Sequence, residues 1–388
     1  MTISWATSRI PSPMSTIIWC KRYSLRSWEV FASMARILIK NGRVFDGARF
    51  WQADVLTDGD RIARIEPDVE ETADLVFDAT GKTVCAGLVD AHVHLRGIST
   101  DKFGTPADLA TIPFGVTAAA DASGEQGNRE LLDSFTVKGA VFAKARFREN
   151  RADLQKTKER IALFGDRAVG VKVYFDTTMS DVTDTAPLRE VCDFAHERGL
   201  IVMVHCANSP TKMADILQTL GTGDILTHAF HGGAQNAAED GFESMRAAQA
   251  RGVIIDVGFA GHVHTDFAIL QHALQSGIVP DLISTDITCL SAYKRGGRYG
   301  MTMCMSIAGA LGMREEEIFR AVTVSPAKAL GRSAEWGLLQ PGRAADVAVF
   351  DLADQPFDLT DKAGNRVCGR EGYRCVLTLC DGQVAYKD

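Results

Sequence analysis

The alternation of apolar and polar positions is strand-like at both ends of the chain. Between residues 34 and 86, short apolar runs alternate with turn residues such as Asn41 and Gly42, a pattern typical of hairpins. The same pattern returns between residues 340 and 388. We therefore predict that residues 34–86 and 340–388 together form one composite β-sandwich.

Between residues 87 and 339, buried strand patterns alternate with helical stretches, as in parallel β-α units. The predicted strands are 87–94, 115–121, 141–145, 170–175, 200–205, 225–228, 253–257 and 282–286. Eight parallel strands with their helices, in about 250 residues, predict an α/β fold with a closed (β/α)8 TIM barrel. An open, doubly wound sheet is the alternative, but no G-x-G-x-x-G motif supports it.

Residues 1–33 differ from the rest of the chain. They carry four basic residues and one acidic residue, with many serines and no apolar periodicity. An acid-poor leader of this kind resembles a transit peptide, although it lacks the compact apolar run of a secretory signal. Because Met34 opens a strand pattern, we expect residues 1–33 to be a disordered or wrongly assigned leader outside the fold.

Composition and charge exclude several classes of protein. The chain has 388 residues, of which 46% are hydrophobic and 23% charged, as in ordinary globular proteins. Its net charge is -7, without a basic cluster suited to nucleic acid, and no run approaches the roughly 18 apolar residues of a membrane helix. The nine cysteines are scattered without a C-x-x-C pair, which fits a reducing cytoplasm. We therefore expect a cytoplasmic protein without nucleic-acid or membrane partners.

Residues that can bind metal or move protons stand at the C-terminal ends of several predicted strands. They are His92, His94, Lys172, His205, His228 and Asp286. In a (β/α)8 barrel this edge carries the active site, so residues far apart in the sequence converge there. His92 and His94 are two apart on a strand and therefore face the same side, where both can bind one ion. The pattern predicts a metal centre.

The motif Val-Asp-Ala-His-Val-His at residues 89–94 resembles the H-x-H signature of the amidohydrolase superfamily. The order H-x-H, lysine, histidine, histidine, aspartate is similar to that of its binuclear subtype, and the resemblance spans residues 34–388. Residues 223–232 and 280–286 resemble the deacetylase group that is often labelled dihydroorotase-like. The resemblance implies a metal-dependent hydrolase that cleaves the acyl bond of a small N-acyl or O-acyl carboxylic acid.

The resemblance also implies a role for each residue of the metal centre. The H-x-H pair would bind the more buried of two zinc ions, and His205 and His228 the more exposed one, with other divalent ions as alternatives. Lys172 would be carboxylated and bridge both ions, because a carbamate is a hard oxygen donor whereas an ammonium is no ligand. Asp286 would bind the first ion and act as general base towards an activated water.

Other polar residues near the strand ends leave alternatives open. Arg96 extends the motif to H-x-H-x-R, in which dihydroorotase relatives hold a substrate carboxylate with the arginine; a surface position is the alternative. His231 either contacts substrate or is a loop residue. A second H-x-H, His262 and His264, follows the seventh predicted strand in glycine-rich sequence, and we predict that it lies outside the site.

Three further functions remain open at this stage. A cyclic-amide hydrolase of the dihydroorotase or hydantoinase kind shares these ligands, and so does a deaminase. A non-catalytic scaffold is an alternative from another class, but such proteins have lost metal ligands, whereas this chain keeps every position. The expected partner is a small-molecule substrate, and a homo-oligomer is compatible with the barrel.

Overall fold

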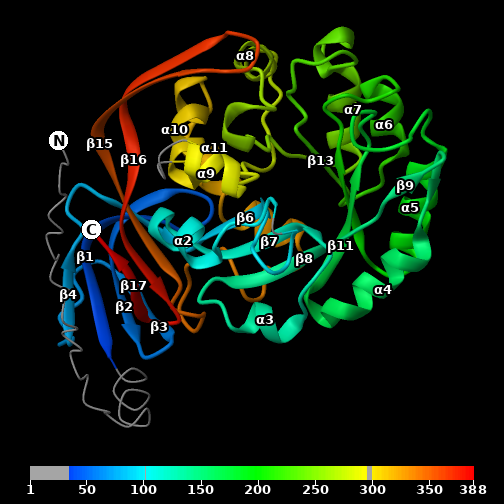
Figure 1. Ribbon diagram of the computed structural model, residues 1–388. Coiled ribbons are helices and arrows are strands. Elements are labelled where there is room, and N and C mark those ends of the chain that lie inside the picture. The colour runs from blue at the N-terminus through cyan, green and yellow to red at the C-terminus, as the bar shows by residue number, and fades with distance from the viewer. Residues whose placement is uncertain (1–34, 101, 295–298) are drawn as a thin grey trace, which may run out of the picture.

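The computed structural model describes residues 35–100, 102–294 and 299–388. Strands from both chain ends form one large sheet, and a curled parallel sheet with helices around it forms the rest of the molecule (Figure 1). The predicted leader, residues 1–33, lies outside the described residues, so its separation from the fold stays a prediction.

The first sheet contains eight strands in the order β17-β16-β15-β5-β1-β2-β3, and β4 also pairs with β1. Their bounds are β1 (Arg36–Phe45), β2 (Phe50–Asp58), β3 (Arg61–Glu66), β4 (Leu75–Asp78), β5 (Thr83–Ala86), β15 (Val347–Thr360), β16 (Arg366–Cys380) and β17 (Gln383–Lys387). Antiparallel pairing of Val347 with Ala86 joins the two chain ends. Ile39, Val55 and Leu377 are buried together in its core, because strand side chains alternate between two faces.

The second sheet contains seven parallel strands in the order β14-β13-β12-β11-β8-β7-β6. They are β6 (Leu88–Val93), β7 (Val116–Gly124), β8 (Lys138–Lys144), β11 (Ala168–Tyr174), β12 (Ile201–His205), β13 (Ile225–Thr227) and β14 (Ile254–Ile255). Each of them overlaps one of the first seven strands predicted for the barrel. The α/β architecture of a TIM barrel is therefore confirmed.

The eighth predicted strand is irregular, yet it closes the barrel. Leu282 bridges Asp256, which directly follows β14, and Ile287 bridges Val93 at the end of β6. Between these two bridges Asp286 has a φ of 46°, in the left-handed region. A regular strand cannot pass through this conformation, because strand residues need a negative φ. The segment therefore pairs with both neighbours without forming a continuous ladder.

Short helices follow most of the barrel strands. Their bounds are α2 (Ala107–Thr111), α3 (Arg129–Asp133), α4 (Leu154–Phe164), α5 (Ala186–His196), α6 (Met213–Thr219), α7 (Glu243–Ala250), α8 (Phe267–Gln275), α9 (Cys289–Lys294), α10 (Met301–Ala310), α11 (Glu315–Ala321) and α12 (Val324–Ala329). In α5, for example, Leu188, Val191, Cys192 and Ala195 are buried. They recur every three or four residues and so cover one face of the helix. Among the described residues, no helix is both long and apolar enough to cross a bilayer.

The sheet of chain ends and the barrel share one hydrophobic core. The rings of Phe45 and Phe50 lie 4.9 Å apart, and Phe50 meets Phe319 edge to face at 5.4 Å. Phe350 packs on the same ring of Phe319 at 6.0 Å. At Gly115 a Cβ atom would lie only 2.5 Å from the Phe350 ring, so a glycine is needed for this close approach. The core holds the barrel at a defined position beside the sheet.

Strands β15 and β16 extend as a long hairpin beyond the sheet and reach α8 (Figure 1). Along the way, Tyr373 donates its backbone N–H to Ser306 Oγ of α10 at 2.9 Å. At the tip, Phe267 N–H at the start of α8 donates to Asp361 Oδ2 at 2.7 Å. The hairpin thus places residues from the C-terminal part of the chain beside the loops that follow the barrel strands.

Candidate metal centre

The structure brings all six residues of the predicted metal centre together at the C-terminal ends of the barrel strands. A cavity of about 320 Å³ opens there. Five of the six residues line it, namely His92, His94, His205, His228 and Asp286. Lys172 on β11 is fully buried, and its Nζ lies 3.3 Å from His92 Nε2.

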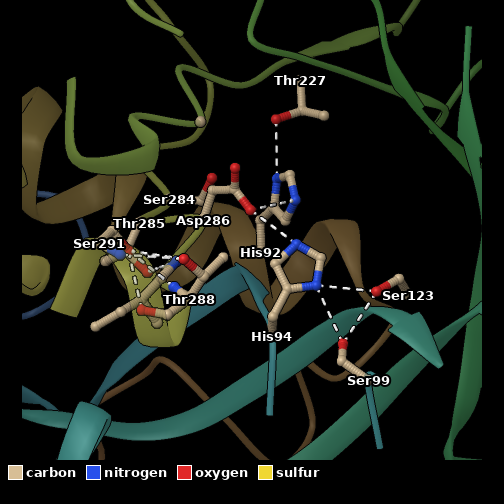
Figure 2. Close-up of polar contacts among 12 residues, drawn as sticks. His92, His94, Ser99, Ser123, Thr227, Ser284, Thr285, Asp286, Thr288 and Ser291 are labelled. Carbon is tan, nitrogen blue, oxygen red and sulfur yellow. Dashed lines mark hydrogen bonds and ion pairs between the residues drawn. The ribbon is translucent and has the colours of Figure 1, made fainter. Parts of the chain in front are cut away.

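His92, His94 and Asp286 form the first group of donors (Figure 2). Asp286 Oδ1 lies 3.2 Å from His92 Nε2 and 2.9 Å from His94 Nε2. The three side chains offer two imidazole nitrogens and a carboxylate oxygen within 4.8 Å of one another. Such a mixture of nitrogen and oxygen donors suits zinc and other divalent transition metals.

The other ring nitrogens of this pair are occupied by hydroxyl groups, as Figure 2 shows. His92 Nδ1 lies 3.0 Å from Thr227 Oγ1, and His94 Nδ1 lies 2.9 Å from Ser123 Oγ and 3.1 Å from Ser99 Oγ. Hydrogen bonds of this kind fix the orientation of a metal-binding imidazole and leave its second nitrogen for the ion. Both Nε2 atoms therefore face Asp286.

His228 provides the sharpest test of whether the residues fit a metal ion. Its Nδ1 donates to the carbonyl oxygen of Gly258 at 2.7 Å, so its Nε2 carries a lone pair. That Nε2 atom is buried, has no hydrogen-bond partner among the described residues, and lies 3.7 Å from Asp286 Oδ2. An acceptor that is buried without a partner is costly. A cation bound at His228 Nε2 would satisfy this atom.

The backbone is also unusual at His228 and Asp286. His228 has a φ of 58° and directly follows β13, and Asp286 likewise lies in the left-handed region. Residues other than glycine rarely adopt this left-handed backbone conformation, and those that do are often found at functional sites. Gly258, with a φ of 58°, leaves no room for a Cβ atom, which would lie 2.3 Å from Thr227 Oγ1 and 2.7 Å from His228 Nδ1.

His205, His228 and His264 form the second group of donors, again within 4.8 Å of one another. The rings of His205 and His228 lie 4.6 Å apart. His205 Nε2 is 3.1 Å from Asp176 Oδ2, which also accepts a hydrogen bond from Asn208. The Asp176 contact occupies one nitrogen of His205 and leaves Nδ1 for an ion.

The prediction that the second H-x-H lies outside the site is wrong for His264. The ring of His264 lies 4.3 Å from that of His228 and 5.0 Å from that of His205. The loop after β14 folds back over the barrel through Gly258 and Gly261, which both have a positive φ. Loops after barrel strands also belong to the active-site face, and this rule was the available signal for His264.

The electrostatics at His205, His228 and Asp286 favour metal binding. Burial lowers the pKa of His205 to about 4 and takes the pKa of His228 well below its usual value, so both rings are neutral at pH 7. Burial alone would raise the pKa of Asp286, but His92 and His94 hold it well below its usual range. Neutral imidazoles and an ionised carboxylate are the protonation states that bind metal.

The two predicted substrate-binding residues, Arg96 and His231, do not line the cavity of the metal centre. Arg96 is exposed and does not line the cavity. His231 is buried and lines a neighbouring cavity rather than the first one. Cys206, beside His205, is also buried, and burial raises the pKa of its thiol to about 12, which argues against a nucleophilic cysteine.

An apolar rim surrounds the opening of the cavity. It consists of Phe103, Met179, Val263 and Leu290, whose exposed fractions lie between 36% and 51%. These residues belong to loops, and the alternation of positions that reveals strands does not identify them. The rim is suited to the apolar part of a small substrate.

Comparison with known proteins gives one consistent result. A sequence model described as "Amidohydrolase family" matches residues 83–382. A deacetylase of Enterococcus faecalis is 26% identical over 90% of this chain and 98% of its own length. A deacetylase of Agrobacterium fabrum is 29% identical over 82% of this chain and 83% of its own.

Solved structures share the fold. A dihydroorotase superimposes with a TM-score of 0.78 at 23% identity and covers 92% of this chain and 98% of its own. An adenine deaminase has the same TM-score at 24% identity, with 91% and 99% covered. At these identities the likeness shows the barrel and its accompanying sheet but does not distinguish between substrates.

Proposed function

The chain belongs to the amidohydrolase family, and from this premise we propose that it is a deacetylase that hydrolyses the acyl bond of a small N-acyl or O-acyl carboxylic acid. The partnerless Nε2 atom of His228, which faces Asp286, carries the proposal of a metal-dependent site. Relatives named deacetylase that align along most of both chains support the choice of an acyl bond.

We propose two zinc ions for this site. The first would be held by His92, His94 and Asp286, and the second by His205 and His228. Nitrogen and carboxylate donors support zinc over magnesium or calcium, which prefer oxygen donors. Three protein donors on the first ion and two on the second would leave room for water, as catalytic zinc sites require.

Lys172 is proposed to bridge the two ions as a carbamate. Its amine is completely buried, and it forms no ion pair within 4.0 Å of any described carboxylate. Burial lowers the pKa of Lys172 to about 8, so the neutral amine needed for carboxylation is accessible near pH 7. The amine would add to carbon dioxide and release one proton, which converts a poor ligand into an anionic oxygen donor.

The ions, when bound, would lower the pKa of a water molecule and polarise the acyl carbonyl. Asp286 is ionised at neutral pH, so its carboxylate can accept a proton from the attacking water and pass it to the leaving nitrogen or oxygen. The hydroxyl groups of Thr227 and Ser123 keep the His92 and His94 rings in place during this transfer. The apolar rim would hold the substrate and restrict the entry of bulk water.

Replacing Lys172 with alanine is expected to prevent assembly of a two-ion centre, because the bridging donor is lost. Short carboxylic acids such as formate should partly restore the second ion by supplying an oxygen bridge. Lys144→Ala is the matched control: Lys144 ends the neighbouring strand β8 and pairs with Glu125 at 3.1 Å. Metal content per subunit, measured by mass spectrometry, checks the prediction.

A second measurement tests the carbamate directly. Protein equilibrated with 13C-bicarbonate should show a carbamate signal by NMR in the wild type and in Lys144→Ala but not in Lys172→Ala. Two bound ions without a carbamate signal in the wild type would refute the role proposed for Lys172.

The proposed function is tested by a hydrolysis screen of the zinc-loaded protein. The panel contains N-acyl amino acids, acyl esters of hydroxy acids, cyclic amides and imides, and aminopurines. We expect turnover of acyl compounds. Turnover confined to the cyclic compounds would favour a dihydroorotase-like or hydantoinase-like enzyme, and turnover confined to aminopurines would favour a deaminase. A protein that binds no divalent ion would instead be a scaffold.

A cytoplasmic location remains a prediction. The eight described cysteines are all free, and six of them are buried, which agrees with a reducing compartment. A homo-oligomeric state is likewise a prediction.

A further inference from the structure

A second cavity adjoins the metal centre. Its volume is about 270 Å³, and Val263 and His264 line both cavities. The other residues that matter here are His231, Thr265 and Lys362, which line the second cavity alone. A ligand that occupies both cavities must pass beside the His264 ring.

Two hydrogen-bond donors of the second cavity are buried without partners. His231 is 2% exposed, and its Nδ1 accepts the N–H of Gly233 at 3.1 Å. The proton of the neutral ring therefore lies on Nε2, which has no acceptor among the described residues. Thr265 is also 2% exposed, and its Oγ1 has no partner among them either. Buried donors in native proteins are normally satisfied, so both point to a missing acceptor.

A positive charge reaches the same cavity from the C-terminal part of the chain. Lys362 lies in the turn between β15 and β16, is exposed, and forms no ion pair with the described carboxylates. The turn is held in place because Asn365 Nδ2 donates to Asp361 Oδ2 and to Asp266 Oδ1, both at 3.0 Å. The hairpin thus presents its lysine at a defined position.

Asp266 is the carboxylate in the lining of this cavity, and one of its two oxygens is already engaged in hydrogen bonds. Its Oδ1 accepts the backbone N–H groups of Ala268 and Ile269 at 3.0 Å, which caps the N-terminus of α8. Anionic groups at this end of a helix are stabilised by the helix dipole. His231, Thr265 and Lys362 offer donors to the same cavity, so it suits an anionic acceptor.

We propose that the second cavity binds the carboxylate of the substrate, with His231 Nε2 and Thr265 Oγ1 as hydrogen-bond donors and Lys362 as the cation. The inference rests on the proposed function, since the acyl bond of the same molecule would lie at the metal centre. It assigns to these residues the role that the H-x-H-x-R motif suggests for Arg96, which lies outside both cavities.

The experiment measures binding independently of turnover. Metal-loaded Asp286→Asn protein is titrated calorimetrically with N-acetyl ω-amino acids, from N-acetylglycine to N-acetyl-6-aminohexanoate, and with their primary amides. The series varies the distance between the acetyl group and the carboxylate. At one chain length we expect the acid to bind about tenfold or more tightly than its amide, as charge-assisted hydrogen bonds predict.

Three further substitutions, each made in the Asp286→Asn protein, test which residues bind the carboxylate. Lys362→Met should remove most of this preference for the acid, and the isosteric Thr265→Val should reduce it several-fold, while the affinity for the amide stays within about twofold. Arg96→Met is the matched control and should leave the preference unchanged. The proposal is overturned if no chain length favours the acid, or if Arg96→Met removes the preference and Lys362→Met does not. Failure of the hydrolysis screen with wild-type protein would instead refute the deacetylase proposal.

Discussion

Replacing His228 with alanine is expected to remove bound metal and activity together. The ring nitrogen that faces Asp286 has no hydrogen-bond partner among the described residues, so no other role accounts for it. Alanine keeps the backbone but offers no donor, and turnover should fall to near background. The same result is expected for His92→Ala, His94→Ala and His205→Ala, since each removes one donor from the two groups.

The measurement is the number of metal ions per subunit after dialysis, together with kcat for the best compound of the screen. His272→Ala is the control, because this histidine on α8 is exposed and contacts the Phe242 ring rather than the metal centre. Circular dichroism of each variant separates loss of metal from loss of folding. Full metal content and normal turnover in all four ligand variants would show that the site is wrongly assigned.

Asp286→Asn is expected to lower kcat by roughly 10²–10⁴-fold while much of the metal stays bound, because proton transfer contributes about that much. The amide has nearly the shape of the carboxylate but cannot accept the proton of the attacking water. Asparagine also tolerates the left-handed backbone of this position, where φ is 46°, so the substitution should not disturb the loop.

Asp381→Asn is the matched control for this experiment. Asp381 has a φ of 45°, but it lies between β16 and β17 and pairs with Lys138 at 2.7 Å, far along the chain from the metal-binding loops. Its replacement should leave kcat unchanged. Metal content and single-turnover rates of both variants are compared. An Asp286→Asn protein with near-normal turnover would exclude Asp286 as the general base.

The local pattern of residues along the sequence was sufficient to predict the repeating parts of the fold. Strand side chains alternate strictly, so the two-residue spacing of His92 and His94 predicts that both face one side, as the structure shows. The carboxyl ends of parallel strands meet at one edge, so Lys172, His205 and His228 could be expected there before any contact was known. The same periodicity predicted that strands from both chain ends share a fold, as β5 and β15 do.

The prediction that Arg96 contacts the substrate assumed that the chain stays extended from His94 to Arg96. Equal facing at two-residue spacing holds only while the chain remains extended. Strand β6 ends at Val93, His94 follows directly, and the chain turns at Gly97, where φ is 85°; Arg96, just before this turn, is exposed. The point at which a strand stops depends on which neighbours remain available for pairing, and the alternation of residues does not contain that information.

The sequence alone sufficed to predict the family, the barrel and six candidate metal ligands at its strand ends, because these features follow from short-range periodicity and from a motif in fixed order. The position of His264 beside His205 and His228 is visible only in the folded chain, since the loop after β14 turns back at Gly258 and Gly261. The same is true of Lys362 and His231, which line one cavity although they are far apart in the sequence. Contacts between distant loops arise from packing of the whole chain, so no local pattern specifies them.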